Sequence, residues 1–216
     1  MSTVEYIKEQ YGQLSKSGDA LETTRKQAYN RFIEKGLPTI RHEEWKYTRI
    51  AALFNNALKL TSAKATVDFK KLPGHESANV LVFVNGIYQS SQSTIRSTAL
   101  TVIALEEAAQ HEYADVVKQH FGHSGQYLND GINALNTAFT NGGIFISVGK
   151  SKIVEQPVYI YNIADAGKEA ILAQPRSLVH LNVNAQLQIV EHFISLGQQP
   201  AFTNQVMEVV VETDAR

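Results

Sequence analysis

The spacing of apolar residues changes near residue 143, and this change limits the folds that the chain can adopt. Before it, apolar residues recur at steps of three and four, which predicts helices. After it, they alternate with polar residues, most clearly from Val179 to Ile189. This run is too long for one ordinary strand, so we expect a bend near Asn184, with Val183 and its apolar neighbours kept inward. The pattern predicts an α+β protein, with a mainly helical domain over residues 1–142 and layered β structure over residues 143–216.

The first part of the chain carries clear signals for helix ends and for one hairpin. A helix is expected to begin at a capping box formed by Asp19 and Glu22, and to end at Gly36. Asn85-Gly86 follows a short apolar run and predicts a small hairpin near residues 80–88. Helices are expected, in order, over residues 2–14, 19–36, 104–121 and 132–139.

The strands after residue 143 allow more than one architecture. Strands are expected over residues 144–148 and 158–161, and again over residues 206–212. Their spacing shows no clean repeat, so a sandwich, a barrel and a β-helix all remain open. The last of these strands would leave an exposed edge. Either it is paired on both sides, or the chain is part of a longer protein, or another chain covers it.

Composition excludes several classes of function. The 20 Lys and Arg residues balance 21 Asp and Glu residues, so there is no electrostatic case for binding nucleic acid or an anionic membrane surface. The chain has no cysteine and therefore supplies no disulfide, thiolate nucleophile or Cys-ligated metal. The first residues do not form a signal peptide, and no apolar run is long enough to span a membrane. We expect a cytoplasmic protein.

Two features that could bind a ligand have simpler structural interpretations. Gly142-Gly143 is expected to end a helix before a strand, because no helix follows it that could hold a phosphate. His120 and His123 lie three residues apart, but a zinc site needs about four ligands. We therefore favour a solvated helix end, where a cationic histidine suits the helix dipole.

Polar residues on the expected strands are weak candidates for a site. His180 and His192 fall on the polar face of the strand pattern. Glu191 falls at an inward position, where it is expected to mark a bulge or to pair with a buried base. The adjacent pairs Glu43-Glu44 and Glu106-Glu107 point apart on a helix or strand, so we interpret them as solvated charge.

The stretch from His42 to Tyr47 contains the only tryptophan, Trp45, and the densest mixture of side-chain types. It could line a ligand cleft, but we favour an anchor that docks the helical hairpin onto the rest of the chain. No catalytic, cofactor-binding or metal-ligating residue is therefore predicted. The residues alone favour a scaffold or interaction protein over an enzyme.

An ordered set of short motifs resembles the SufD family. The set spans residues 36–204 and consists of residues 36–39, 41–48, 81–88, 135–139, 142–143, 155–158 and 175–176. The resemblance implies a subunit of the SufBCD complex, a scaffold for iron–sulfur cluster assembly, that pairs with SufB and binds the ATPase SufC. It also implies a helical region followed by a right-handed parallel β-helix, and so favours that architecture over a sandwich or barrel.

The resemblance further implies that this chain corresponds to the N-terminal half of a family member. Later β-helix rungs, the SufC-binding helices and the histidine implicated in cluster assembly are expected beyond residue 216. No family site residue is carried onto this chain, and no cofactor is expected in this segment. A cluster would be bound only through the complete complex.

Two other functions remain open from the sequence. A β-helix carbohydrate-active enzyme would need a cluster of inward carboxylates and usually secretion. A generic interaction module would use its exposed β edge to add a partner strand, and a homodimer through that edge is possible.

Overall fold

The computed structural model describes residues 3–14, 18–55, 57–60, 67–68 and 71–216. Helical segments come first and strands dominate the second half, so the α+β class is confirmed. The α-helices are α1 Thr3–Leu14, α2 Glu22–Lys35, α3 Leu105–Ala108, α4 Ala114–His120 and α5 Gly131–Ala138. The 3-10 helices are η1 Glu43–Trp45, η2 Ile50–Asn55, η4 Ser90–Gln92 and η5 His123–Gln126. The strands are β1 Asn79–Val84, β2 Ile87–Tyr88, β3 Leu100–Ala104, β4 Ile144–Val148, β5 Val158–Ala166, β6 Ile171–Ala173, β7 Arg176–Leu181, β8 Ile189–Gly197, β9 Ala201–Thr203 and β10 Val206–Val211.

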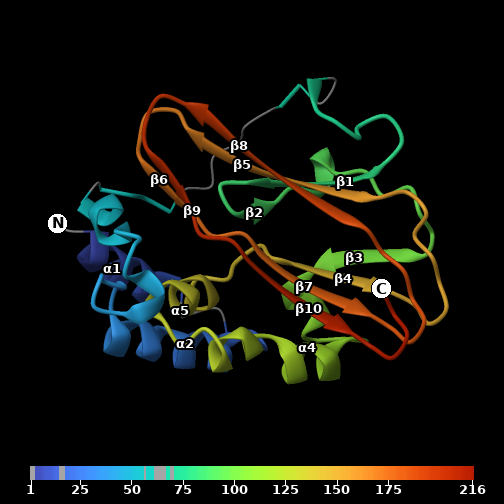
Figure 1. The fold of residues 1–216 in the computed structure, drawn as a ribbon, viewed down its shortest axis with the longest axis horizontal. Helices are drawn as coiled ribbons and strands as arrows, with labels where there is room; N and C mark the ends of the chain where they lie inside the picture. Colours follow the sequence, from blue (N-terminus) through green and yellow to red (C-terminus); the bar gives the residue numbers. More distant parts are fainter. Residues whose placement is uncertain (1–2, 15–17, 56, 61–66, 69–70) are drawn as a thin grey trace.

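Two four-stranded sheets lie one above the other, and helices α2, α4 and α5 lie beside the lower one in Figure 1. The upper sheet has the order β2-β1-β5-β8, and the lower sheet has the order β10-β7-β4-β3. A short third sheet joins β6 to β9. The pairs β1–β5, β5–β8, β4–β7, β7–β10 and β6–β9 are parallel, whereas β1–β2 and β3–β4 are antiparallel.

A three-strand unit occurs twice in succession. The inner triplet is β5, β6 and β7, and the outer triplet is β8, β9 and β10. Each strand of the outer triplet pairs in parallel with its counterpart in the inner one, as Val158 with Ile189 and Arg176 with Val206 show. The repeat is therefore visible in the pairing of the strands, although the spacing of apolar residues in the sequence does not show it.

The corners between strands repeat as well. Ser151, Asn184 and Asp214 all have φ between 57° and 60°, which is the left-handed region. Ser151 N–H donates to Val183 O, and Asn184 N–H donates to Thr213 O, each at 2.9 Å. The bend expected near Asn184 is therefore confirmed, as one of a series of stacked turns. The expected inward position of Val183 is wrong, because this residue lies in the turn itself and is exposed.

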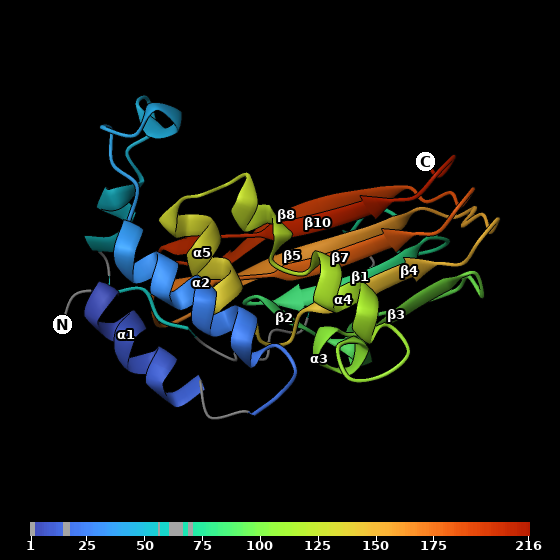
Figure 2. The same cartoon turned by 90° about the horizontal axis from the view of Figure 1, so that it is seen from below.

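The main β core lies between the two sheets. Leu81 and Ile160 from the upper sheet belong to the same buried cluster as Ile146 and Val179 from the lower sheet. A second cluster fills the space between the lower sheet and helices α3 and α4. A third joins α1, α2, η2 and α5, which lie together at one end of the molecule in Figure 2. Both strand-rich and helix-rich parts thus have buried apolar cores.

Several local expectations are confirmed. The hairpin forms, with Phe83 paired to Tyr88 and positive φ at Asn85 and Gly86. Helix α2 ends at Gly36, whose N–H donates to Phe32 O at 2.8 Å. Gly142-Gly143 lies between α5 and β4, as expected of a break between a helix and a strand.

Two helical expectations are wrong. Asp19 does not cap α2, because Leu21 occupies the N-cap; Asp19 instead accepts a bond from Leu21 N–H at 2.9 Å and pairs with Arg25. The single helix expected over residues 104–121 is two short helices, α3 and α4, separated by turns. Apolar residues of both short helices still pack on the lower sheet, and Tyr113, which lies between the helices, contacts the Phe145 ring of that sheet.

The expected division at residues 142 and 143 stays a prediction. Strands from before it, β1 and β3, pair directly with strands from after it, β5 and β4.

Candidate functional site

A buried ion pair joins the two triplets to the helices. Arg176 Nη2 lies 2.5 Å from Glu208 Oε2, and the two side chains are 0% and 8% exposed. Burial lowers the pKa of the Arg176 guanidinium, and the charge of Glu208 acts in the opposite direction. The guanidinium also lies over the Phe121 ring, 4.8 Å from its centre.

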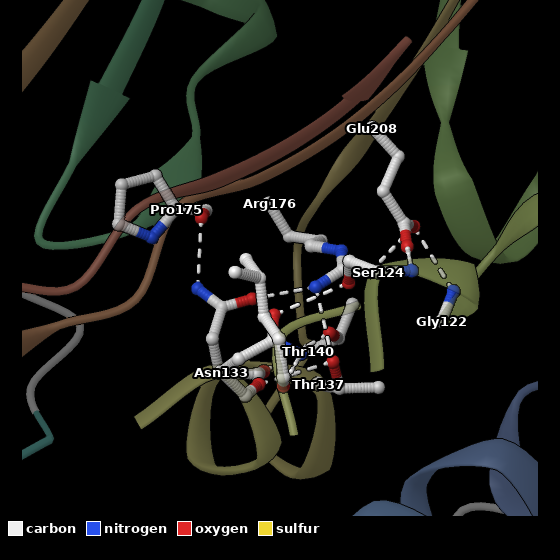
Figure 3. A network of polar contacts seen from close by, with 10 residues as sticks. Gly122, Ser124, Asn133, Thr137, Thr140, Pro175, Arg176 and Glu208 are labelled. Carbon is white, nitrogen blue, oxygen red and sulfur yellow. Dashed lines mark hydrogen bonds and ion pairs between the residues drawn. The ribbon is translucent and has the colours of Figure 1, made fainter. Parts of the chain in front are cut away.

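The remaining partners of this pair come from helix and loop segments (Figure 3). Arg176 Nη1 donates to Asn136 Oδ1 and Thr137 Oγ1 of α5 at 3.1 and 3.0 Å. Glu208 accepts from the backbone N–H groups of Gly122 and Ser124 at 2.9 and 2.7 Å. The network fixes helix α5 and the α4–η5 loop to the lower sheet. Because it is buried, we interpret it as structural and not as a binding site.

Sequence reasoning does not find this network. Arg176 stands out only within a motif, and Glu208 only as a polar residue in an alternating strand. The only indication in the sequence is a positive charge near the start of one strand and a negative charge near the start of another. The two charges can be recognised as an ion pair only when β7 and β10 are known to be neighbours.

His120 and His123 lie at the end of α4 and the start of η5, separated by Gly122 in the left-handed region. His123 Nε2 lies 3.2 Å from Tyr127 Oη. Across the described residues, no group of three or more His, Asp or Glu side chains could hold a metal ion. The end expected for this helix near residue 121 is confirmed, since α4 ends at His120 and Phe121 is its C-cap.

His180 and His192 lie in different sheets. His180 is buried on β7, with Nε2 3.3 Å from Glu212 Oε1 and with Nδ1 lacking any described partner. His192 lies on β8 and stacks on Tyr159, with ring centres 5.6 Å apart. The structure does not bring the two histidines together.

Glu191 lies on the face of β8 that is directed between the sheets. Its register partner is Ile160, a member of the inter-sheet core. Its Oε1 accepts from Asn162 Nδ2 and from Gln205 Nε2, each at 3.1 Å. Burial raises the pKa of the Glu191 carboxyl, and the bond from Asn162 offsets part of that rise. The expected bulge or buried base is wrong, since β8 pairs with β5 without interruption and both partners are amides.

The carboxylate pairs differ from one another. Glu43 and Glu44 are exposed in η1, as expected of solvated charge. Glu106 is instead partly buried, with Oε1 3.4 Å from Arg25 Nη2 and accepting from Gly142 N–H at 3.3 Å. The interpretation of Glu106 as solvated charge is therefore wrong.

The stretch from His42 to Tyr47 projects from the body near α5 in Figure 2, and within it only Trp45 packs against the helical core. Tyr47 is 91% exposed. A cavity of about 510 Å³ separates this stretch from the loop before α5. Its lining residues include Lys35, His42, Glu44, Trp45, Tyr127 and Asp130. Trp45 thus contacts the helical core, while the rest of the stretch borders an open groove. The role of the stretch as an anchor for the helical hairpin stays a prediction.

The outer triplet is the candidate functional site. Its three strands, β8, β9 and β10, each lie at the edge of a sheet. Phe193, Val209 and Val211 are 57%, 52% and 54% exposed, although their register partners Asn162, Val179 and Leu181 are buried. A free strand edge next to exposed apolar side chains is a surface suited to adding another strand.

These features define an α+β protein with stacked parallel strands, a helical cap and an open strand edge. The family model described as "SufBD protein N-terminal region" matches residues 4–160 of this chain. The chain belongs to the SufBD family.

The chain is similar to parts of two longer proteins. It is 27% identical to an iron-sulfur cluster assembly SufBD family protein of Synechocystis sp., over 83% of this chain and 42% of that protein. It is 26% identical to the iron-sulfur cluster assembly protein SufD of Escherichia coli, over 88% of this chain and 43% of that protein. The chain thus spans less than half the length of these relatives. In the part of the chain that the structure describes, no helix is both long and apolar enough to cross a membrane.

Proposed function

We propose that this chain is part of a non-enzymatic scaffold subunit for iron–sulfur cluster assembly. The observation that carries this proposal is the family match over residues 4–160. Both relatives described above are named as iron-sulfur cluster assembly proteins, which supports the same role here. The cytoplasmic location stays a prediction.

The proposed architecture is a right-handed parallel β-helix. Parallel pairing of three successive strands with three later strands supports it, because each coil of such a fold stacks on the one before. The stacked left-handed corners at Ser151, Asn184 and Asp214 support it as well.

The proposed partners are a SufB-like subunit and a SufC-like ATPase. Family membership supports partnership within the assembly machinery. The iron–sulfur cluster is treated as cargo of the complete complex, and no cofactor is proposed for this segment.

A generic interaction module is the second candidate, favoured by the exposed edge of the outer triplet. A carbohydrate-active enzyme has less support, because hydrolysis of a glycosidic bond ordinarily uses two carboxyl groups that flank it. The inward Glu191 is bonded instead to two amides, Asn162 and Gln205.

Co-purification tests the assembly role. The tagged full-length protein is expressed together with its SufB-like and SufC-like neighbours, and the retained proteins are quantified by mass spectrometry. We expect both to be retained in fixed proportion, and retention of neither would contradict the proposal. Phe193→Lys on the outer triplet and Ile95→Lys elsewhere are matched variants, since both residues are exposed. Equal retention by both variants would exclude the Phe193 surface as the contact.

A further inference from the structure

The open groove at the helical end of the molecule is formed largely by residues of the sequence motifs. Its cavity of about 510 Å³ lies between residues 36–48 on one side and residues 127–131 on the other. This is within the size range of ligand-binding clefts, roughly 300–1,000 Å³. From His42 to Tyr47, only Trp45 packs against the helical core, so the other side chains that line the groove are not needed for that packing.

The floor of the groove is backbone from two helix ends. Gly36 and Gly131 both line the groove, and a Cβ on Gly131 would lie 1.7 Å from Gly36 O. The end of α2 is therefore in direct contact with the start of α5. Because the two walls are joined through this contact, the groove exists before any ligand enters it, and preorganisation lowers the cost of binding.

The charges around the groove favour a cation. Among the described residues, no ion pair or side-chain hydrogen bond involves the carboxylate of Glu44 on one wall. Asp130 on the other wall accepts from Asn133 N–H at Oδ1, 2.8 Å away, and none of the described donors reaches Oδ2. Lys35 is the one lysine or arginine in the described lining, and it lies in the last turn of α2, where it offsets the helix dipole. The groove thus offers carboxylate oxygens on both walls.

Aromatic rings on both walls favour a guanidinium group over an ammonium group. Trp45 lies in one wall, and Tyr127, which is 77% exposed, lies in the other. The face of an aromatic ring attracts a cation. A guanidinium is planar, so it can stack on a ring while its edge donates paired N–H groups to a carboxylate, whereas an ammonium is a compact point charge. Arginine is the side chain that matches both features of the lining.

Exposed apolar side chains beside the groove favour an arginine carried by a protein segment. Leu128 lines the groove and is 54% exposed, and Ile40, in the segment that forms the opposite wall, is 50% exposed. Residues that flank an arginine in a partner protein would cover such side chains, and a free guanidinium compound would leave them in water. Large apolar anchors beside a desolvated charge are typical of protein–protein contacts.

We propose that the groove binds an arginine side chain of a partner protein. The guanidinium group lies between the carboxylates of Glu44 and Asp130, against the rings of Trp45 and Tyr127. Apolar residues on either side of the arginine cover Leu128. This inference goes beyond the proposed function and does not rest on it, because it depends only on the groove and its lining.

Titration of the 216-residue chain with short peptides tests the inference. Three five-residue peptides, acetylated and amidated to remove terminal charges, carry Arg, Lys or citrulline between leucines. Citrulline has nearly the shape of arginine but no charge. Trp45 is the only tryptophan, so the NMR signal of its indole N–H reports on the groove directly. We expect the arginine peptide to bind most tightly and the citrulline peptide on the order of tenfold more weakly.

Variants on the two walls test the charges and the ring separately. Glu44→Gln and Asp130→Asn are each expected to weaken binding of the arginine peptide by about threefold to tenfold, and asparagine still caps α5. Glu43→Gln makes the same change in charge at an exposed position outside the lining, so it is expected to have little effect. Tyr127→Ala is expected to weaken binding, whereas Tyr47→Ala, which removes a 91% exposed ring outside the lining, is not.

Four results would overturn the inference. They are equal binding of the arginine and citrulline peptides, no shift of the Trp45 signal with any peptide, equal effects of Glu44→Gln and Glu43→Gln, and a homodimer in sedimentation that Tyr127→Ala dissociates. N-acetylargininamide is expected to bind more weakly than the arginine peptide. Equal binding would assign the groove to a free guanidinium compound and would overturn the partner segment.

Circular dichroism checks that each variant folds. If Asp130→Asn does not fold, Glu44→Gln and the three peptides decide, because Glu44 is exposed and lies outside the helical core. Failure of the co-purification experiment would leave these binding results unaffected, so the two proposals can fail separately.

Discussion

Arg176 and Glu208 form a buried ion pair, 2.5 Å between Nη2 and Oε2, that connects neighbouring parallel strands β7 and β10. Each partner also binds a segment outside the sheets, α5 for Arg176 and the α4–η5 loop for Glu208. The pair therefore sets where the helical cap rests on the strands. Its value lies in keeping each buried charge compensated, because a lone buried charge is far more costly than a pair.

Removing one partner is expected to destabilise the fold strongly. Arg176→Met leaves Glu208 without a cation in a buried site, and we expect a loss of about 3–5 kcal/mol in unfolding free energy. Glu208→Gln keeps one acceptor oxygen, for only one of the Gly122 and Ser124 N–H groups, and leaves the buried Arg176 guanidinium without an anion, so it is also expected to destabilise the fold. Urea denaturation followed by circular dichroism measures both.

The exposed pair of Lys59 and Glu169 is the matched control for this prediction. Lys59→Met is expected to leave the urea midpoint nearly unchanged, because water solvates both groups. Equal shifts for Arg176→Met and Lys59→Met would contradict the role assigned to the buried pair.

The sequence was sufficient where a feature is local. The hairpin at Asn85-Gly86, the end of α2 at Gly36 and the bend at Asn184 each depend on residues close in the chain. The partners of Arg176 and Glu191 lie in other segments: on β10 and α5 for Arg176, and on β5 and the connection between β9 and β10 for Glu191. The parallel pairing of the strands brings these segments together. The spacing of apolar residues does not reveal which residues pair between neighbouring strands, because turns such as the one at Val183 interrupt the alternation.

Glu191 is expected to make stability depend on pH. Burial raises its native pKa above that of the unfolded chain, so the native state binds more protons between the two values. Stability therefore falls as pH rises through that window, and the cost is fully present above the native pKa. Glu191→Gln removes the charge and keeps an acceptor for Asn162 and Gln205.

Urea midpoints measured from pH 3 to pH 8 check this prediction. The unchanged chain and Glu191→Gln are expected to have similar stability below about pH 4, the range of an ordinary glutamate pKa. Above it the variant should become the more stable of the two. Glu155→Gln, at an exposed site, should follow the unchanged chain throughout. If the urea midpoint of Glu191→Gln varied with pH in parallel with that of the unchanged chain, the raised native pKa of Glu191 would be refuted.

Two glycines are expected to respond to alanine in opposite directions. A Cβ at Gly131 would lie 1.7 Å from Gly36 O, because α5 begins against the end of α2. Gly131→Ala is therefore expected to cost at least about 1–3 kcal/mol through overpacking. Gly12 lies in α1, where an added Cβ would meet nothing within 4 Å, so Gly12→Ala should stabilise by about 0.5–1 kcal/mol. Thermal unfolding measures the change in stability of both variants. Changes of the same sign would contradict the packing described around Gly131 and Gly12.

The corner at Asn184 gives a test of the stacked turns. Its φ of 57° lies in the left-handed region, which asparagine tolerates better than residues with a bulkier or apolar Cβ substituent. Asn184→Ala is expected to cost about 1 kcal/mol, and Asn184→Gly less, because glycine has no Cβ penalty there. Urea denaturation of the two variants measures the difference.

Asn30 in α2 serves as the control for this corner, since it is also exposed but lies in a regular helix. Asn30→Ala is expected to raise stability slightly, because alanine is the better helix former. A loss at Asn184 with a gain at Asn30 combines the backbone conformation with the bond from Asn184 Nδ2 to Ser151 Oγ at 3.4 Å. Asn184→Gly also lacks that bond, so the difference between Asn184→Ala and Asn184→Gly isolates the backbone conformation. In this turn Asn184 N–H donates to Thr213 O. Equal changes in stability for Asn184→Ala and Asn30→Ala would show that the turn does not require a residue that tolerates positive φ at position 184.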